Sequence, residues 1–357
     1  MIRFYRMFYG IQNIWKIFFQ ILEEQEEVYT NKMWQQFSPE TPQWPTAELI
    51  IISIFPLVFV LVGTICNVLC MIVLWSRNQQ DNSRNHQATS TNVYLICLCF
   101  ADTLGLYSFN LDNAIGNLTG KAITDRSLVT CKLIEFMGNY TIHVSVMYLT
   151  MATVDRTSML WSLAYKRKIA QPKQAWKICI LIAGVFVVTD CFLLALGYRA
   201  YDGSIQCYLS TNAVLTKVFN LFTIWFHLVF MSMITFAIMI IFTVLAIIKL
   251  VRLPRVNAAS FLRNKRISVM LGLMCISYIL LTLPNRLCFS VLSPLLESTP
   301  GSNTIYALSN LLTSLASSLN FLYLSVSVKG FWRDLRNLFH LRRFGSNTIG
   351  TTTSTLS

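Results

Sequence analysis

Asp155 and Arg156 form an adjacent acid and base within the otherwise apolar stretch MYLTMATVDRTSMLWSLAY, residues 147–165. Such a pair can hold a charged partner, or it can mark the boundary where a helix leaves a membrane. Cys131 lies 25 residues before Arg156. In a helix this separation is about 37 Å, slightly more than a hydrocarbon core of about 30 Å. The spacing predicts Cys131 at the outer boundary and the Asp155–Arg156 pair at the inner one.

A second acid, Asp102, lies about ten residues into another apolar stretch and therefore near the membrane midplane. A charge at that depth costs roughly 2.5–3.5 kcal/mol on insertion scales, so it needs polar partners. Ser145 is expected at similar depth, midway between Cys131 and Arg156. Further candidate partners come from the first and last apolar stretches: Asn67, Ser317 and Asn320.

Arg286 is the only base that lies well inside an apolar stretch. A guanidinium at that depth is expensive unless an anion meets it. Two interpretations are open. Arg286 forms an internal ion pair with Glu135 or Asp112, or it binds a carboxylate of a ligand through two parallel hydrogen bonds.

The composition assigns the chain to the membrane proteins. Of its 357 residues, 54% are hydrophobic and 13% are charged, whereas soluble domains carry roughly a quarter charged residues. There is no zinc or phosphate-binding motif and no Ser/His/Asp order, so we expect no enzyme. Seven apolar runs are long enough to span a bilayer: 49–75, 91–115, 132–155, 176–197, 217–248, 267–293 and 305–327.

Lys and Arg residues predict the orientation of these spans. The loops on one side, together with segment 328–343, carry seventeen bases and two acids, whereas the loops on the other side carry three of each. By the positive-inside rule the basic side is cytoplasmic and the N-terminus is outside. We predict an extracellular tail at 1–48, a seven-span domain at 49–343 and a cytoplasmic Ser/Thr-rich tail at 344–357. The net charge of +13 follows from this topology and indicates no nucleic acid.

Residues 49–343 resemble the rhodopsin-like G-protein-coupled receptors. The motifs lie in the family's order and on the expected sides of the membrane. They are Asn67 in GTICNVL, Leu98 and Asp102 in LCFAD, Cys131, Asp155 and Arg156 in DRT, Trp176, Pro284 in YILLTLPNR, Asn320 in SSLNFLYLSVS, and Phe331. The chain departs from the family pattern at Thr157, Thr282, Phe321 and Leu324, which makes it a divergent member.

The resemblance implies an all-α bundle of seven transmembrane helices followed by a short amphipathic helix, here 329–343. It also implies a disulfide between Cys131 and Cys207 and a sodium-binding network of Asn67, Asp102, Ser145, Ser317 and Asn320. Ala316 occupies one polar position of that network. A protonated Asp102 in a hydrogen-bonded cluster is therefore the alternative to a sodium ion, and no other cofactor is expected.

The resemblance further implies that a heterotrimeric G protein binds at the cytoplasmic mouth, through Asp155, Arg156, Lys265 and Arg266. Many family members restrain the helix-three Arg with an acid on helix six, and Asn264 stands at that position here. This predicts high basal signalling. A solvated basic rim explains most of the other charges. The Ser/Thr tail suits arrestin binding after phosphorylation, or simple disorder.

Two ligand classes are discounted from the resemblance: retinal, since Ser314 replaces the Schiff-base Lys, and amines, since Gly138 replaces the counter-ion. The remaining outer groups have mixed charge and favour a neuropeptide. A lipid or chemosensory ligand is the alternative, and a seven-span transporter is a more distant one. The candidate pocket residues are Glu135, Gly138, Asn139, Asn285, Arg286, Asn310 and Ser314. Asn117, in NLT at 117–119, is a candidate glycosylation site, and the plasma membrane is the expected location.

Overall fold

The computed structural model describes residues 50–83, 90–162, 165, 169–200, 203–207, 211–252, 258–292, 295–296, 302–327 and 330–337. The predicted tails 1–48 and 344–357 lie outside these residues. So do residues 329 and 338–343 of the predicted amphipathic helix. The boundaries predicted for the three regions therefore remain predictions.

Seven helical segments follow one another in the described part of the chain, and several consist of successive pieces. They are η1 (Ile50–Ile54) with α3 (Phe55–Ser83); α4 (Ser90–Gly105), η2 (Leu106–Asn110) and α5 (Leu111–Thr119); α6 (Leu128–Trp161); α8 (Pro172–Asp190) with η3 (Cys191–Ala195); α9 (Ala213–Leu221), η4 (Phe222–Ile234) and α10 (Thr235–Arg252); α11 (Ala258–Cys288); and α13 (Ser302–Ser318) with α14 (Asn320–Ser327). Two short strands, β1 (Tyr198–Arg199) and β2 (Ile205–Gln206), pair antiparallel.

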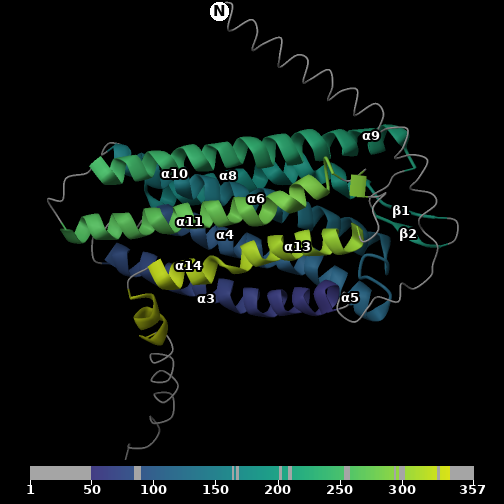
Figure 1. Ribbon diagram of the computed structural model, residues 1–357, viewed down its shortest axis with the longest axis horizontal. Helices are drawn as coiled ribbons and strands as arrows, with labels where there is room; N and C mark the ends of the chain where they lie inside the picture. The colour runs from purple at the N-terminus through teal and green to yellow at the C-terminus, as the bar shows by residue number, and fades with distance from the viewer. Residues whose placement is uncertain are drawn as a thin grey trace, which may run out of the picture.

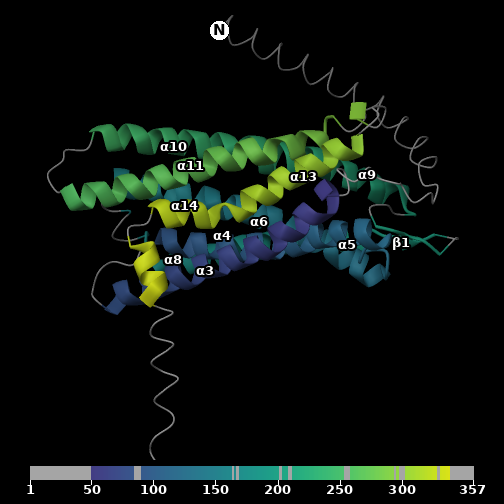
Figure 2. The same cartoon turned by 60° about the horizontal axis from the view of Figure 1, so that its bottom comes forward.

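The segments lie side by side along the long axis of the molecule (Figure 1). The β1–β2 hairpin lies beyond one end of the bundle, which we call the hairpin end, and the view turned by 60° shows the same arrangement (Figure 2). We call the opposite end the Arg156 end. There the short helix Phe331–Asn337 turns from the last segment at a bend of 99°.

Among the described residues, five segments are long and apolar enough to cross a membrane: Ile52–Gln79, Ser90–Thr119, Pro172–Ala195, Trp225–Arg252 and Lys265–Cys288. Thr304–Ser327 with Phe331–Asn337 counts as a sixth if the bent pair is one span. The α6 helix has 34 residues and is long enough to cross a membrane, but it is not apolar enough to be counted among these segments. It packs against α4, α8, α10 and α11, so its polar side chains meet protein rather than lipid.

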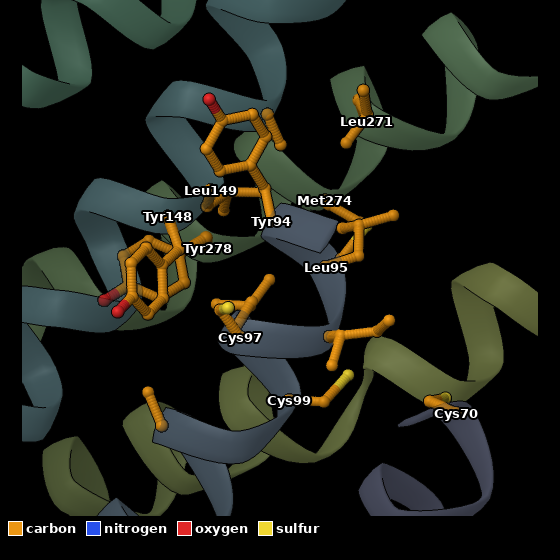
Figure 3. Close-up of a cluster of buried hydrophobic side chains, with 14 of the residues drawn as sticks. Cys70, Tyr94, Leu95, Cys97, Cys99, Tyr148, Leu149, Leu271, Met274 and Tyr278 are labelled. Atoms are coloured by element: carbon orange, nitrogen blue, oxygen red, sulfur yellow. The ribbon is translucent and has the colours of Figure 1, made fainter. Parts of the chain in front are cut away.

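The core lies where α4, α6 and α11 meet. Tyr94 and Leu95 of α4, Tyr148 of α6 and Met274 of α11 gather in one cluster (Figure 3). The Tyr148 hydroxyl donates to the Cys179 carbonyl at 3.1 Å. A buried phenol therefore keeps its hydrogen bond while its ring contributes apolar contact area.

Local sequence signals explain where individual helices begin. Ser127 caps α6, because its side chain accepts from the Thr130 backbone N–H while the Thr130 hydroxyl accepts from the Ser127 N–H. Pro172 is the first residue of α8, a position where its missing N–H costs nothing.

The fifth span, which the sequence predicts as one continuous run, changes helix type along its length. Residues Phe222–Ile234 form a π-helix between α9 and α10. Within it the Ser232 hydroxyl donates to the His227 carbonyl at 3.0 Å, five residues back. π-type segments are rare and are often found at functional sites, because they change which face a side chain occupies.

Candidate functional site

A disulfide ties the hairpin end together. Cys131 at the start of α6 is bonded to Cys207, which follows β2, and their Cα atoms lie 5.5 Å apart. The bond anchors the hairpin segment over the end of the bundle. It joins the two cysteines for which the resemblance implies a disulfide.

Three of the predicted pocket residues make side-chain hydrogen bonds across neighbouring helices near the hairpin end. Asn285 of α11 donates to the Asn310 side-chain carbonyl of α13 at 2.6 Å. Ser314 of α13 donates to the Asn110 side-chain carbonyl at 2.7 Å. These contacts join the second, sixth and seventh segments. Asn110, which was not among the predicted pocket residues, thus contacts one of them.

Three predicted pocket residues occupy consecutive turns of α6. Glu135 is buried, and Asn139 donates to the Glu135 backbone carbonyl at 3.0 Å. Gly138 lies against Phe109, and a Cβ atom added at Gly138 would collide with that ring. The missing side chain thus serves close packing of α6 against η2.

Arg286 belongs to a buried hydrogen-bonded chain that crosses four helices. His143 Nδ1 lies 3.0 Å from Asp190 Oδ2, His143 Nε2 lies 2.9 Å from His227 Nδ1, and the same His227 nitrogen lies 3.2 Å from Arg286 Nη1. We call these four residues the Asp190–Arg286 chain. His143 and Asp190 are fully buried and Arg286 is 4% exposed.

The predicted internal ion pair of Arg286 with Asp112 or Glu135 is absent from the described residues. Asp112 instead accepts from the backbone N–H and the hydroxyl of Thr124, at 2.9 and 3.0 Å. His227, which does contact Arg286, was missed. Its only sequence signal is a lone imidazole in IWFHLVF, within the fifth apolar span.

The residues of the predicted sodium network lie together. Asn320 donates to Asp102 Oδ2 at 2.6 Å, and Asn67 donates to the Ser317 carbonyl at 3.2 Å. Ser145 and Ser317 lie beside the same Asp102 carboxyl group. Two buried oxygens of this cluster, Ser145 Oγ and Asn67 Oδ1, make no hydrogen bond.

These orphaned oxygens and the Asp102 carboxylate fit a hard monovalent cation, because such ions prefer oxygen ligands. Ala316 contributes no ligand from the position beside them. No group of three or more His, Cys, Asp or Glu residues suited to a metal occurs in the described part of the chain.

At the Arg156 end, the Asp155 carboxylate accepts hydrogen bonds from three hydroxyl groups. Ser90 and Thr91 of α4 donate to Oδ2 at 2.6 and 3.1 Å, and Tyr165 donates to Oδ1 at 3.1 Å. Burial raises the pKa of Tyr165, and the Asp155 carboxylate raises it further. Arg156 is 6% exposed in the same region. The carboxylate thus joins α4, α6 and the segment after α6.

The residue that replaces the family's aromatic after Arg156 contacts the neighbouring helix. The Thr157 hydroxyl lies 3.0 Å from the Phe242 carbonyl of α10, and Trp161 Nε1 donates to the Leu245 carbonyl at 3.3 Å. Lys249 of α10 lies 5.0 Å from the centre of the Trp161 ring.

The remaining predicted coupling residues, Lys265 and Arg266, lie exposed on α11. The backbone of Asn264 is helical, and its side chain lies outside the described residues. Arg77 of α3 forms an ion pair with Asp334 at 2.7 Å, and Phe331 and Leu335 are buried. The short helix Phe331–Asn337 is thus held against the bundle.

Asn117, the predicted glycosylation site, lies on α5. Its side-chain nitrogen donates to the Ile52 carbonyl at 3.3 Å. That nitrogen is the atom that would carry a glycan, and the modified amide would keep a single N–H for this contact.

The described part of the structure is a bundle of seven helical segments with polar clusters along its interior, an architecture typical of seven-helix membrane proteins. The family described as 7 transmembrane receptor (rhodopsin family) matches residues 82–323, which is more than half of the chain. The protein therefore belongs to the rhodopsin family of seven-transmembrane receptors, and the predicted fold class is confirmed. It is a multi-pass membrane receptor rather than an enzyme. None of the curated proteins compared with the chain matches it.

Proposed function

We propose that this receptor lies in the plasma membrane with its N-terminus outside, binds an extracellular neuropeptide and activates a heterotrimeric G protein. Residues 1–48 form the extracellular tail, and residues 344–357 form the cytoplasmic tail. The family membership carries the general part of this proposal. The side-chain clusters at the two ends of the bundle support the finer parts.

The cluster around Asp155 supports G-protein coupling at the Arg156 end. Its carboxylate accepts hydrogen bonds from three hydroxyl groups of two other segments. These bonds fix the position of the end of α6 that carries Arg156. Lys265 and Arg266 are exposed on α11. Together these groups offer a buried guanidinium with a basic rim, which suits the carboxyl-terminal helix of a G protein.

The polar groups toward the hairpin end support a peptide ligand. Asn285, Asn310, Ser314 and Asn110 present amide and hydroxyl groups on three helices. Glu135 and Arg286 add opposite charges. A peptide carries backbone amides and charged groups of both signs, so it can match such a surface better than a purely apolar lipid.

The test of this function is a screen of a neuropeptide library on cells that express the receptor, with G-protein activation as readout. We expect at least one peptide to activate cells with the receptor and not untransfected cells. Activation by lipids alone would overturn the peptide assignment. Accumulation of a screened compound in receptor-containing vesicles, without nucleotide exchange, would indicate a transporter instead.

A further inference from the structure

Arg286 is a buried cation that contacts no anion among the residues that the structure describes. One of its partners is uncharged, and the other also contacts His143. It lies two residues after Pro284 in α11 and is 4% exposed. In the described part of the chain no Asp or Glu forms an ion pair with it. Its neighbours are His227 and the Tyr278 phenol. A guanidinium inside a membrane bundle is costly unless an anion meets it, so this position lacks a group that its chemistry requires.

The contact between Arg286 and His227 is a poor substitute for an anion. A guanidinium only donates hydrogen bonds, so its contact with His227 needs the lone pair of Nδ1, and its other acceptor is the uncharged Tyr278 phenol oxygen. His143 Nε2 lies closer to that same nitrogen, at 2.9 Å compared with 3.2 Å for Arg286. A ring nitrogen either carries a proton or offers one lone pair, and it cannot serve both neighbours fully.

No protonation state of the chain satisfies all three contacts and also gives Arg286 a His227 lone pair of its own. When His143 Nδ1 donates to Asp190, a neutral His143 has only its Nε2 lone pair to offer. If His227 Nδ1 donates to that lone pair, it cannot accept from Arg286. If His227 Nδ1 is unprotonated, either His143 Nε2 also donates to its single lone pair, or two lone pairs face each other at 2.9 Å. The chain thus leaves either Arg286 or the His143–His227 contact without a complete hydrogen bond.

We propose that Arg286 is the binding site for an anionic group of the activating ligand, chemically a carboxylate, and that His227 is the acceptor which this group replaces. The inference rests on the proposed receptor function and specifies the ligand chemistry at that site. A carboxylate offers two oxygens to the guanidinium fork. His227 Nδ1 then donates to His143 Nε2, and no donor in the chain is left over.

The exchange of acceptors also connects binding to helix movement. Arg286 lies on α11, whereas His227, His143 and Asp190 lie on η4, α6 and α8. The Arg286–His227 contact joins α11 to these three helices. A carboxylate that takes the place of His227 at Arg286 therefore releases this contact between α11 and η4.

The experiment uses purified receptor in lipid nanodiscs and affinity selection from a library of short peptides. Each sequence has neutral side chains and is made twice, with a free carboxyl terminus and with a terminal amide. We expect wild-type receptor to retain acid forms at least tenfold more than their amides. Arg286→Gln should abolish this preference, and Arg286→Lys should retain only part of it, because Lys lacks the fork. Arg126→Gln, which removes an exposed cation from the loop after α5, should leave the preference intact.

Equal retention of acids and amides by the wild type would overturn the proposal, as would failure to retain any acid form. An equal loss in Arg126→Gln would also overturn it, since the preference would then reflect general charge. Acetate, succinate and glutamate are added as competitors to identify the source of the carboxylate. If they displace the peptides, free organic acids are the ligand class, and if they do not, the carboxylate belongs to a peptide.

His227→Phe provides a second test in case Arg286→Gln does not fold. It removes the competing acceptor and keeps the guanidinium, so affinity for acid-terminated peptides should rise several-fold. An unchanged or lower affinity would contradict the acceptor exchange. Basal nucleotide exchange on a G protein is measured with the same preparations. Carboxylate binding without nucleotide exchange would refute the proposed G-protein coupling but support the anion site. Nucleotide exchange without a carboxylate preference would support the coupling but refute the anion site.

Discussion

At the scale of single residues, Asp155 shows how a charge at a helix end is held by neighbours far away in the sequence. The sequence places it next to Arg156, but its carboxylate accepts hydroxyl groups from Ser90, Thr91 and Tyr165. The membrane depth of Asp155 follows from residue counting, because a helix rises about 1.5 Å per residue. Its lateral partners do not follow, because no count along one helix says which face meets α4.

Asp155→Asn should weaken this cluster. An amide offers one acceptor oxygen, and its NH₂ group would face hydroxyl donors, at a cost of about 1–3 kcal/mol. We expect a lower thermal midpoint in detergent and a higher basal nucleotide-exchange rate, because α4, α6 and Tyr165 are no longer tied together. Asp334→Asn is the comparison, since it removes one ion pair near the same end but outside the cluster, and it should lower the midpoint less than Asp155→Asn. An unchanged midpoint would show that the three hydrogen bonds contribute little.

The cluster around Asp102 leads to a separate prediction about sodium binding. Wild-type receptor should melt at a higher temperature in sodium chloride than in choline chloride of equal ionic strength, because the smaller cation can reach Asp102 and the two orphaned oxygens. At a sodium concentration tenfold above Kd the stabilisation is about 1.4 kcal/mol. Asp102→Asn should remove the difference between the two salts. If wild type and Asp102→Asn respond equally, the cluster holds no sodium and the hydrogen-bonded alternative is correct.

At the scale of elements, the disulfide connects the start of α6 to the segment that follows the β1–β2 hairpin. Cys131→Ser and Cys207→Ser should each reduce surface expression or ligand binding. The double variant should be no worse than either one, because each single change already breaks the same bond. Loss of a disulfide typically costs about 2–5 kcal/mol. Additive defects in the double variant would mean that the two thiols act independently.

Helix type explains why some elements of the site were predictable and others were not. Asn67, Asp102 and Asn320 could be grouped from the sequence, since polar residues at one depth in apolar helices must find one another. His227 could not be placed, because it lies in the π-helix Phe222–Ile234. The wider turn there changes the face on which a residue lies, so α-helical periodicity gives the wrong direction. Without His227, the contact of Arg286 could not be predicted.

The α6 helix was predicted as a membrane span although its composition is less apolar than that of its neighbours. Its polar side chains, such as Thr150 and Thr153, donate to carbonyls one turn back, at 2.7 and 2.9 Å. They are satisfied within the helix and surrounded by other helices. The order of motifs, rather than hydropathy, made this helix recognisable.

At the scale of the whole molecule, the proposal is that binding at the hairpin end alters the Arg156 end. Asn264 stands where many family members carry an acid. Asn264→Glu should lower basal nucleotide exchange, because a new carboxylate on α11 would restrain the Arg156 guanidinium. Asn264→Gln is the control for size and should change basal exchange little. If Asn264→Glu leaves basal exchange unchanged, the absent acid does not set the basal activity.

The most direct test of G-protein coupling is nucleotide exchange by a G protein with purified wild-type receptor and with Arg156→Ala, both in nanodiscs. Binding of a screened peptide agonist and surface expression are measured on the same two proteins. Arg156 and the predicted pocket residues lie at opposite ends of the bundle, so we expect agonist binding by Arg156→Ala to stay within about twofold of wild type. We expect nucleotide exchange to fall to the receptor-free rate. Exchange by Arg156→Ala equal to that of the wild type would contradict the proposed coupling site.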